Sequence, residues 1–181
     1  MTSPKAEEQG HALAMSLRAA YSHFRRSSNV AFAPLGMTSD QFVLLWNLQR
    51  EGQATQQELV RLCFSDTATI GSMVTLLKRR GLVTRVAHPL DGRAWAVQLT
   101  EAGRDLTGKL LHQSKDLRAK LTSLFDEAEL QILTKMLARV AQTMQPPPRK
   151  PATNGKLATA TPNGRTSAHR KQSPRHTNRK S

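Results

Sequence analysis

The chain of 181 residues has a single cysteine and no long apolar run. One cysteine excludes an internal disulfide and fits a reducing cytoplasm. The longest stretch without a charged residue runs over 13 residues from Ser27 to Ser39 and contains Pro34, whereas a membrane-spanning helix needs roughly 20 apolar residues. The first residues also lack the basic start and apolar run of a signal peptide. We therefore expect a cytoplasmic protein with no membrane partner.

The sequence also lacks the patterns of an enzyme active site or a metal site. Its six histidines are scattered, and none is paired at metal-ligand spacing. It has neither a glycine-rich phosphate loop nor a GxSxG nucleophile motif. The carboxylates are spread along expected helix surfaces and caps, away from any nucleophile. We expect a protein that is not an enzyme and that has no cofactor and no metal.

Acidic residues are scarce, and their shortage is uneven along the chain. The whole chain has 27 Lys and Arg against 13 Asp and Glu, a formal charge of +14. Residues 146–181 hold nine of these bases, six prolines and no acid, so this tail carries +9 and the first 145 residues carry +5. The tail is too polar to bury a core, and we expect it to be disordered.

The basic balance makes nucleic acid the first partner to consider, although charge alone does not separate DNA from RNA or an acidic membrane surface. We expect the tail to attract phosphate without regard to sequence. The alternative is a solubility tail that contacts nothing.

Apolar spacing and capping signals predict a series of helices between residues 11 and 145. Apolar side chains recur at helical spacing over residues 11–32, and this helix should end before Pro34. Gly52 should end the second helix. Capping boxes mark the starts of three further helices, in the pairs Thr38 with Gln41, Thr55 with Glu58, and Asp126 with Glu129.

A helix capped by Ser65 or Asp66 follows the one that opens at Thr55, after a tight turn. Its apolar stripe has the spacing of one helix face and comprises Ile70, Met73, Val74 and Leu77. Gly81 stands where a helix-ending glycine belongs, after a basic trio suited to a helix C-terminus.

The apolar period then changes from helical to two. Residues 82–87 and 93–99 predict two strands, and residues 88–92 contain the Pro and Asp-Gly signals of a hairpin loop. Thr100 should cap one long helix whose apolar face extends to Leu124. This order of helices and a hairpin is that of a winged helix-turn-helix.

The helix after the tight turn carries small polar residues opposite its apolar stripe, and they are the candidate DNA contacts. They are Ser65, Thr67, Thr69, Ser72 and Thr75. Short side chains let a helix approach the floor of the major groove, and their hydroxyls can bond phosphates or base edges. The alternative is an ordinary solvated helix face.

Arg93 lies beside the tip of the predicted hairpin, and Asp91 is placed to hold the guanidinium or the loop. An arginine at such a tip suits a narrow minor groove, where the negative potential is enhanced. The alternative is an ordinary turn with an incidental ion pair.

Several of these segments, in this order, resemble the MarR family of bacterial transcriptional regulators. The resemblance covers most of residues 11–145. The segments that carry it are Thr38–Phe42, Thr55–Leu59, Phe64–Gly71, Leu77–Val83, His88–Arg93 and Leu99–Arg104. The chain departs from the family at Gly92, where many members have a second wing arginine, so the wing contacts would be fewer.

The resemblance implies a mainly α protein with a small β-hairpin wing: a winged helix-turn-helix lobe at about 38–100 and dimerisation helices at 11–33 and 100–145. Residues 1–10 would be a flexible N-terminus. In the family, the dimerisation helices interlock in a homodimer and two recognition helices enter successive major grooves of double-stranded DNA. The groove contacts would fall on Thr67, Thr69, Ser72 and their neighbours, and the wing contact on Arg93.

Family members often bind small aromatic acids or phenols between the dimer helices and the DNA-binding lobe, so we expect such an effector here and leave its residues unassigned. The side chains weighed for this cleft, against core packing or a solvated face, are Tyr21, His23, Arg25, Trp46 and Arg50. Cys63 is expected to act as a small buried apolar residue. The leading function is a ligand-relieved repressor, and the alternative is an architectural protein that coats DNA with little sequence choice.

Overall fold

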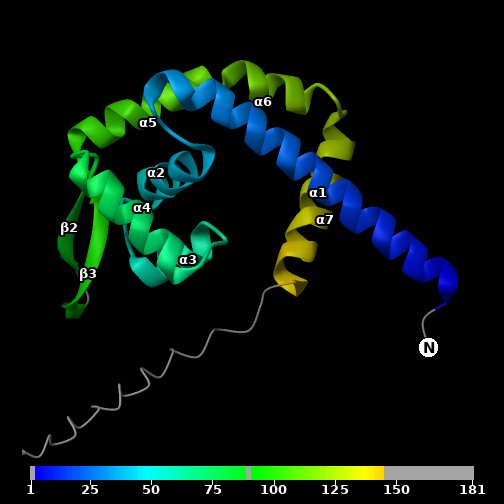
Figure 1. The fold of residues 1–181 in the computed structure, drawn as a ribbon, viewed down its shortest axis with the longest axis horizontal. Coiled ribbons are helices and arrows are strands. Elements are labelled where there is room, and N and C mark those ends of the chain that lie inside the picture. Colours follow the sequence, from blue (N-terminus) through cyan, green and yellow to red (C-terminus); the bar gives the residue numbers. More distant parts are fainter. Residues whose placement is uncertain (1–2, 89–90, 145–181) are drawn as a thin grey trace, which may run out of the picture. The chain divides into compact units, whose positions relative to one another are not determined.

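The computed structural model describes residues 3–88 and 91–144, and the expectations for the tail at 146–181 lie outside them. The described part is mainly helical with one three-stranded sheet (Figure 1). The helices are α1 (Pro4–Phe32), η1 (Ala33–Leu35), α2 (Ser39–Glu51), α3 (Gln56–Leu62), α4 (Thr67–Arg79), α5 (Glu101–Gln113), α6 (Lys115–Thr122) and α7 (Glu127–Thr143). The strands are β1 (Gln53–Thr55), β2 (Val83–His88) and β3 (Asp91–Leu99). The predicted winged helix-turn-helix fold is confirmed.

Helix α1 is longer than the sequence indicated. It begins at Pro4, so that residues 4–10, expected to be flexible, are helical. A proline in the first turn has the backbone angle of a helix already set, and Glu7 in the same turn complements the helix dipole. The helix ends at Phe32, before Pro34, as predicted.

The predicted caps form as the sequence indicates. Thr38 and Thr55 each accept from the third backbone N–H of their helix, and Gln41 and Glu58 reach back to the cap residue. Asp66, the second of the two candidates, caps α4 and accepts from the backbone N–H of Thr69 at 2.9 Å. Local hydrogen bonds thus set where these helices begin.

The sheet has the strand order β1-β3-β2, and all neighbours are antiparallel. The hairpin of β2 and β3 was predicted, but β1 was not. This short strand pairs Gln53 with Gln98 and Thr55 with Ala96. Three residues are too few to show a period of two, and the pairing joins segments far apart in the chain.

The core lies between α2, α3, α4, α5 and the sheet. Three of the four predicted stripe residues of α4 are almost fully buried in it, namely Ile70, Val74 and Leu77. In α2, Phe42 and Trp46 are only half-buried, whereas Leu44 is fully buried.

The prediction of one long helix from Thr100 to Leu124 is wrong, because the helix breaks at Ser114 between α5 and α6. The Ser114 hydroxyl donates to the carbonyl of Leu110 at 3.0 Å. The guanidinium of Arg118 donates to the carbonyl of Leu111 at 2.9 Å. The carbonyl of Leu110 still accepts from the backbone N–H of Ser114 at 3.0 Å, so its bond from the hydroxyl is an additional one. The bond from Arg118 satisfies the carbonyl of Leu111 with a side chain at the helix end.

Helix α5 crosses the start of β2 at Gly103, with no room for a side chain. A Cβ atom on this buried glycine would lie 2.0 Å from the carbonyl oxygen of Leu82. The same carbonyl accepts from the backbone N–H of Thr100 at 3.1 Å, so it is held in place. Gly108, on the same helix, has nothing within 4 Å of its Cβ position.

We predict that Gly103→Ala lowers the free energy of unfolding by about 3 kcal/mol, because the methyl group must displace backbone in a packed contact. The matched control Gly108→Ala should raise it by about 1 kcal/mol, since alanine is the better helix former where space is open. Urea unfolding followed by circular dichroism, at one protein concentration, measures both. Equal stability of Gly103→Ala and the parent would contradict the close approach.

Candidate nucleic-acid interface and adjoining cavity

Helix α4 turns a polar edge away from the core, and this edge forms one wall of an open groove. The helix lies beside the hairpin (Figure 1). The other wall of the groove includes Arg85 of β2. The groove has a volume of about 640 Å³. The residues that line this α4–β2 groove are Thr67, Ala68, Gly71, Ser72, Thr75, Leu76, Arg79 and Arg85.

The hydroxyls in the α4–β2 groove stand on a helix whose position is fixed. The Thr75 hydroxyl donates to the carbonyl of Gly71 at 2.8 Å, which leaves its oxygen free to accept and its methyl group exposed. The amide of Gln56 on α3 donates to the carbonyl of Thr67 at 3.2 Å and ties the first turn of α4 to α3. The first half of α4 therefore presents its small side chains from a braced backbone.

Two arginines make the groove basic, and neither was predicted from the sequence to contact DNA. Arg79 belongs to the basic trio read as complementing the end of α4. Arg85 lies in β2 on the same face as the buried Val83, which the period of two would have revealed. None of the side chains listed above for the α4–β2 groove is acidic, so its charge favours phosphate.

The five candidate residues of the helix-turn-helix fall into two groups. Thr67, Ser72 and Thr75 line the α4–β2 groove. Ser65 and Thr69 instead line a separate cavity on the other side of α4. The Thr69 hydroxyl donates to a carboxylate oxygen of Asp66 at 2.8 Å, so it also belongs to the cap.

The wing candidates can be placed only by their backbone. Asp91 opens β3 and pairs with His88 of β2 across the hairpin. The strand thus starts two residues before the predicted start at Arg93. The side chains of Asp91 and Arg93 lie outside the part of the chain that the structure describes.

The second cavity, of about 690 Å³, is lined by residues of α1, α2, α4 and the turn before α4. The lining residues of this α1–α4 cavity are Tyr21, Arg25, Asp40, Val43, Cys63, Phe64, Ser65, Thr69 and Met73. It includes two of the five side chains weighed for an effector cleft, Tyr21 and Arg25. Arg50 lines a different cavity, beside α3.

An ion pair lies at the α1–α4 cavity. The guanidinium of Arg25 donates to a carboxylate oxygen of Asp40 at 2.8 Å, and both side chains are partly exposed. This hydrogen bond, together with the charge of Asp40, raises the pKa of Arg25 above its ordinary value. The cavity therefore contains a permanent cation whose partner is a single exposed carboxylate.

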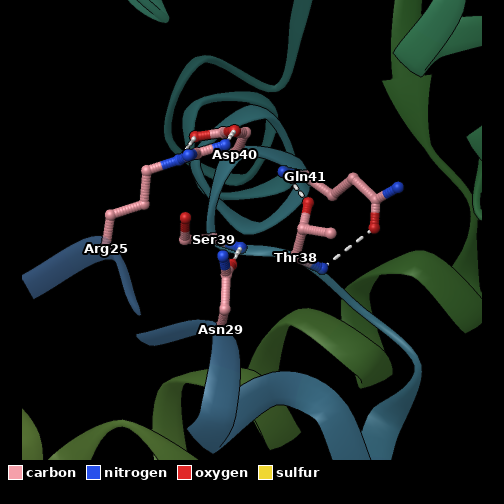
Figure 2. A network of polar contacts seen from close by, with 6 residues as sticks. All are labelled: Arg25, Asn29, Thr38, Ser39, Asp40 and Gln41. Carbon is pink, nitrogen blue, oxygen red and sulfur yellow. Dashed lines mark hydrogen bonds and ion pairs between the residues drawn. The ribbon is translucent and has the colours of Figure 1, made fainter. Parts of the chain in front are cut away.

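The ion pair is part of a network that fixes α1 to the first turn of α2. Figure 2 shows Arg25 and Asn29, both from α1, reaching this turn beside the capping box of Thr38 and Gln41. The side-chain oxygen of Asn29 accepts from the backbone N–H of Ser39 at 2.7 Å. The helix that bears the predicted dimer contacts is thus joined directly to the DNA-binding lobe.

Two neighbouring residues of the α3–α4 turn also line the cavity. Cys63 is half-buried; desolvation raises its thiol pKa, which disfavours the reactive thiolate and agrees with a packing role. Phe64 is 77% exposed and has a φ of 49°, a left-handed conformation that costs a non-glycine residue about 1–2 kcal/mol. No pattern in the sequence indicated this strain.

Other classes of site are not found in the described residues. Between residues 3 and 144, apart from 89 and 90, there is no cluster of three His, Cys, Asp or Glu side chains suited to a metal ion. No helix within those bounds is both long and apolar enough to span a membrane.

Comparison with known proteins agrees with the fold. The sequence profile of the MarR family matches residues 35–94. The HTH-type transcriptional repressor NicR of Pseudomonas putida is 40% identical over 75 residues, which are 41% of this chain and 48% of NicR.

Solved structures extend the likeness to most of the described chain. A probable transcriptional regulator from Pseudomonas aeruginosa is 32% identical, with a TM-score of 0.59 over 70% of this chain and 95% of that one. A mutant MarR from E. coli, solved with operator DNA, is 25% identical, with a TM-score of 0.65 over 71% of this chain and 93% of that one. The chain therefore belongs to the MarR family of DNA-binding transcriptional regulators, proteins that are not enzymes.

Proposed function

We propose that this regulator is a cytoplasmic, homodimeric repressor that reads a specific sequence in double-stranded DNA and is released by a small aromatic acid. The observation that carries the proposal is the α4–β2 groove, where the described lining residues combine exposed hydroxyls with two guanidiniums and include no acid. NicR, a relative by sequence, is a repressor by name, which supports the direction of control.

The groove residues contact different parts of the DNA, according to the chemistry of their side chains. Thr67, Ser72 and Thr75 enter the major groove, where their hydroxyls meet base edges and the threonine methyl groups meet thymine. Arg79 and Arg85 neutralise phosphates along the α4–β2 groove.

The remaining candidates lie at the edges of the same interface. Ser65, just before α4, donates to phosphate where the helix N-terminus favours an anion. Thr69 lies at the same helix end, and its hydroxyl would have to leave Asp66 to donate there. Arg93, supported by Asp91, enters the adjacent minor groove from the wing. Both assignments rest on position in the chain and in the fold.

A second copy of the chain would cover apolar surface that one copy leaves exposed. On α1, Leu13 is 65% exposed, and Leu17, Tyr21 and Phe24 lie near the same helix face. Helix α7 exposes Ile132, Met136 and Leu137. Soluble monomers rarely expose such stripes, whereas a homodimer buries them. Two-fold symmetry then calls for a palindromic site with half-sites about one helical turn apart.

The α1–α4 cavity is the proposed effector site. Tyr21 and Phe64 offer aromatic surface, and Arg25 offers a charge-assisted hydrogen bond to a carboxylate. An aromatic acid would take the place of the Asp40 carboxylate. Because the cavity also includes Ser65 and Thr69, the bound acid touches the start of α4, the helix proposed to bind DNA. Through this contact, binding of the acid would favour release of the DNA.

An architectural protein is the second candidate function, and the +14 charge of the whole chain favours it. Such a protein would bind random DNA nearly as well as any selected site, whereas a regulator prefers its operator by about a thousandfold or more.

We predict that Arg85→Ala and Arg79→Ala each weaken binding to a short labelled duplex and flatten its salt dependence. Each lost phosphate contact lowers the magnitude of the log-log salt slope by about 0.9, so a variant present in both copies of a dimer loses about 1.8. Fluorescence anisotropy over a series of salt concentrations measures the slope. Lys120→Ala, on α6 and outside the groove, is the matched control, and a slope equal to the parent's in both arginine variants would refute the contact.

We predict that Leu13→Asp shifts the protein from dimer to monomer, because it places a carboxylate in the apolar dimer face of α1. Ser22→Asp is the control. It adds the same charge nine residues, or about two and a half turns, further along α1, which is on the opposite face of the helix, and it should leave the dimer intact. Sedimentation equilibrium distinguishes the two states. A monomeric parent, or a Leu13→Asp dimer as strong as the parent's, would contradict this assignment.

We predict that Asp40→Asn binds salicylate, or another acid from an aromatic panel that releases DNA, about tenfold more tightly than the parent, because Arg25 loses its competing partner. Arg25→Ala should bind the same acid about tenfold more weakly. Calorimetric titration gives both affinities, and Arg50→Ala, in the other cavity, is the control. The proposal fails if no acid of the panel releases DNA, or if neither variant departs from the parent.

A further inference from the structure

Trp95 on β3 is one of the two tryptophans of the chain, and it is 64% exposed. A tryptophan left in water forfeits the burial of a large apolar side chain. None of the residues assigned above to DNA, to the dimer or to the effector is Trp95. Its place in the sheet indicates what covers it.

The register of the hairpin puts Trp95 on the side of the sheet that faces the core and α4. Side chains alternate along a strand, so Trp95 shares a face with Val97 and Leu99, both buried. On β2, Arg85 pairs with Val97 and lines the α4–β2 groove. Trp95 is therefore one step beyond Arg85 along the same face, toward the hairpin end.

The neighbours of Trp95 leave the indole uncovered. Its partner on β2 is Ala87, which is exposed and too small to cover an indole ring. On the other edge of β3, Thr55 pairs with Ala96, and the chain turns into α3 at the next residue, Gln56. Gln56 in turn donates to Thr67, the first residue of α4. The exposed indole thus lies on the side where the proposed reading helix begins.

We propose that Trp95 contacts DNA, with its indole packed on the sugar–phosphate backbone between the major groove entered by α4 and the minor groove reached by the wing. The apolar ring suits deoxyribose, and the indole N–H can donate to a phosphate. A duplex is the occupant that fits, because the same face continues into a groove whose described lining includes two guanidiniums and no acid. The inference rests on the proposed function of duplex binding.

The test uses the intrinsic fluorescence of single-tryptophan variants of the full chain. Trp46→Phe leaves Trp95 as the only tryptophan, and Trp95→Phe leaves Trp46 as the matched control. Each is titrated with a mixed-sequence duplex at low ionic strength, and acrylamide quenching is measured in the free and the saturated protein. We expect the quenching constant of Trp95 to fall at least threefold at saturation and that of Trp46 to stay the same.

Binding affinities add a second readout. Trp95→Ala should bind the duplex about tenfold more weakly than the parent, and Trp95→Phe, which keeps an apolar ring, should lie between them. Because the side chain is exposed, the circular dichroism spectrum and unfolding midpoint of Trp95→Ala should match those of the parent.

The failures of the two proposals are distinguishable. If the parent binds no duplex at low ionic strength, the proposed function is wrong. If the parent binds and Trp95 is quenched equally in the free and saturated protein, the duplex does not cover Trp95 and this inference alone is overturned.

Discussion

The burial of one face of α4 is the constraint on which the rest of the structure depends. Ile70, Val74 and Leu77 are almost fully buried in the core, and this fixes the rotation of the helix about its axis. A helix turned by one residue would expose part of this stripe at a cost of about 1.5–3 kcal/mol for each large side chain. The hydrophobic effect therefore decides which polar side chains line the α4–β2 groove.

The same helix also borders the α1–α4 cavity, and this sharing gives a physical route for control. Thr67 and Thr69 are two residues apart, yet one lines the groove and the other the cavity. Suppose that the first turn of α4 has one position that suits DNA and another that does not. A molecule in the cavity that binds these two positions with different free energies changes the free energy of DNA binding by up to that difference. Arg25 and Asn29 extend the connection to α1, and from there to the proposed dimer face.

The sequence predicted those parts of the fold that depend on neighbouring residues. Capping boxes operate within four residues, and the stripe of α4 repeats within one helix, so both could be read directly. Strand β1 could not, because three residues show no period and their partners lie in β3. At the break at Ser114, Arg118 of α6 donates to the carbonyl of Leu111 in α5. The apolar spacing continues across Ser114, so the sequence pattern gave no sign of the break.

The candidate site was predicted in the same uneven way. Thr67, Ser72 and Thr75 were found because a polar edge opposite an apolar stripe is visible in one helix. Arg85 was missed because it lines the groove only through the face of β2 that meets α4, and this packing is not visible in the sequence. Tyr21 and Arg25 were weighed for a cleft, but the cavity they line depends on α1 packing on α2 beside the start of α4.

The central claim, that the α4–β2 groove reads DNA sequence, is tested most directly by selecting bound duplexes from a random pool. It predicts a palindromic site with half-sites about one helical turn apart, preferred at least about a thousandfold over random DNA; recovery of unrelated duplexes bound with equal affinity would contradict it.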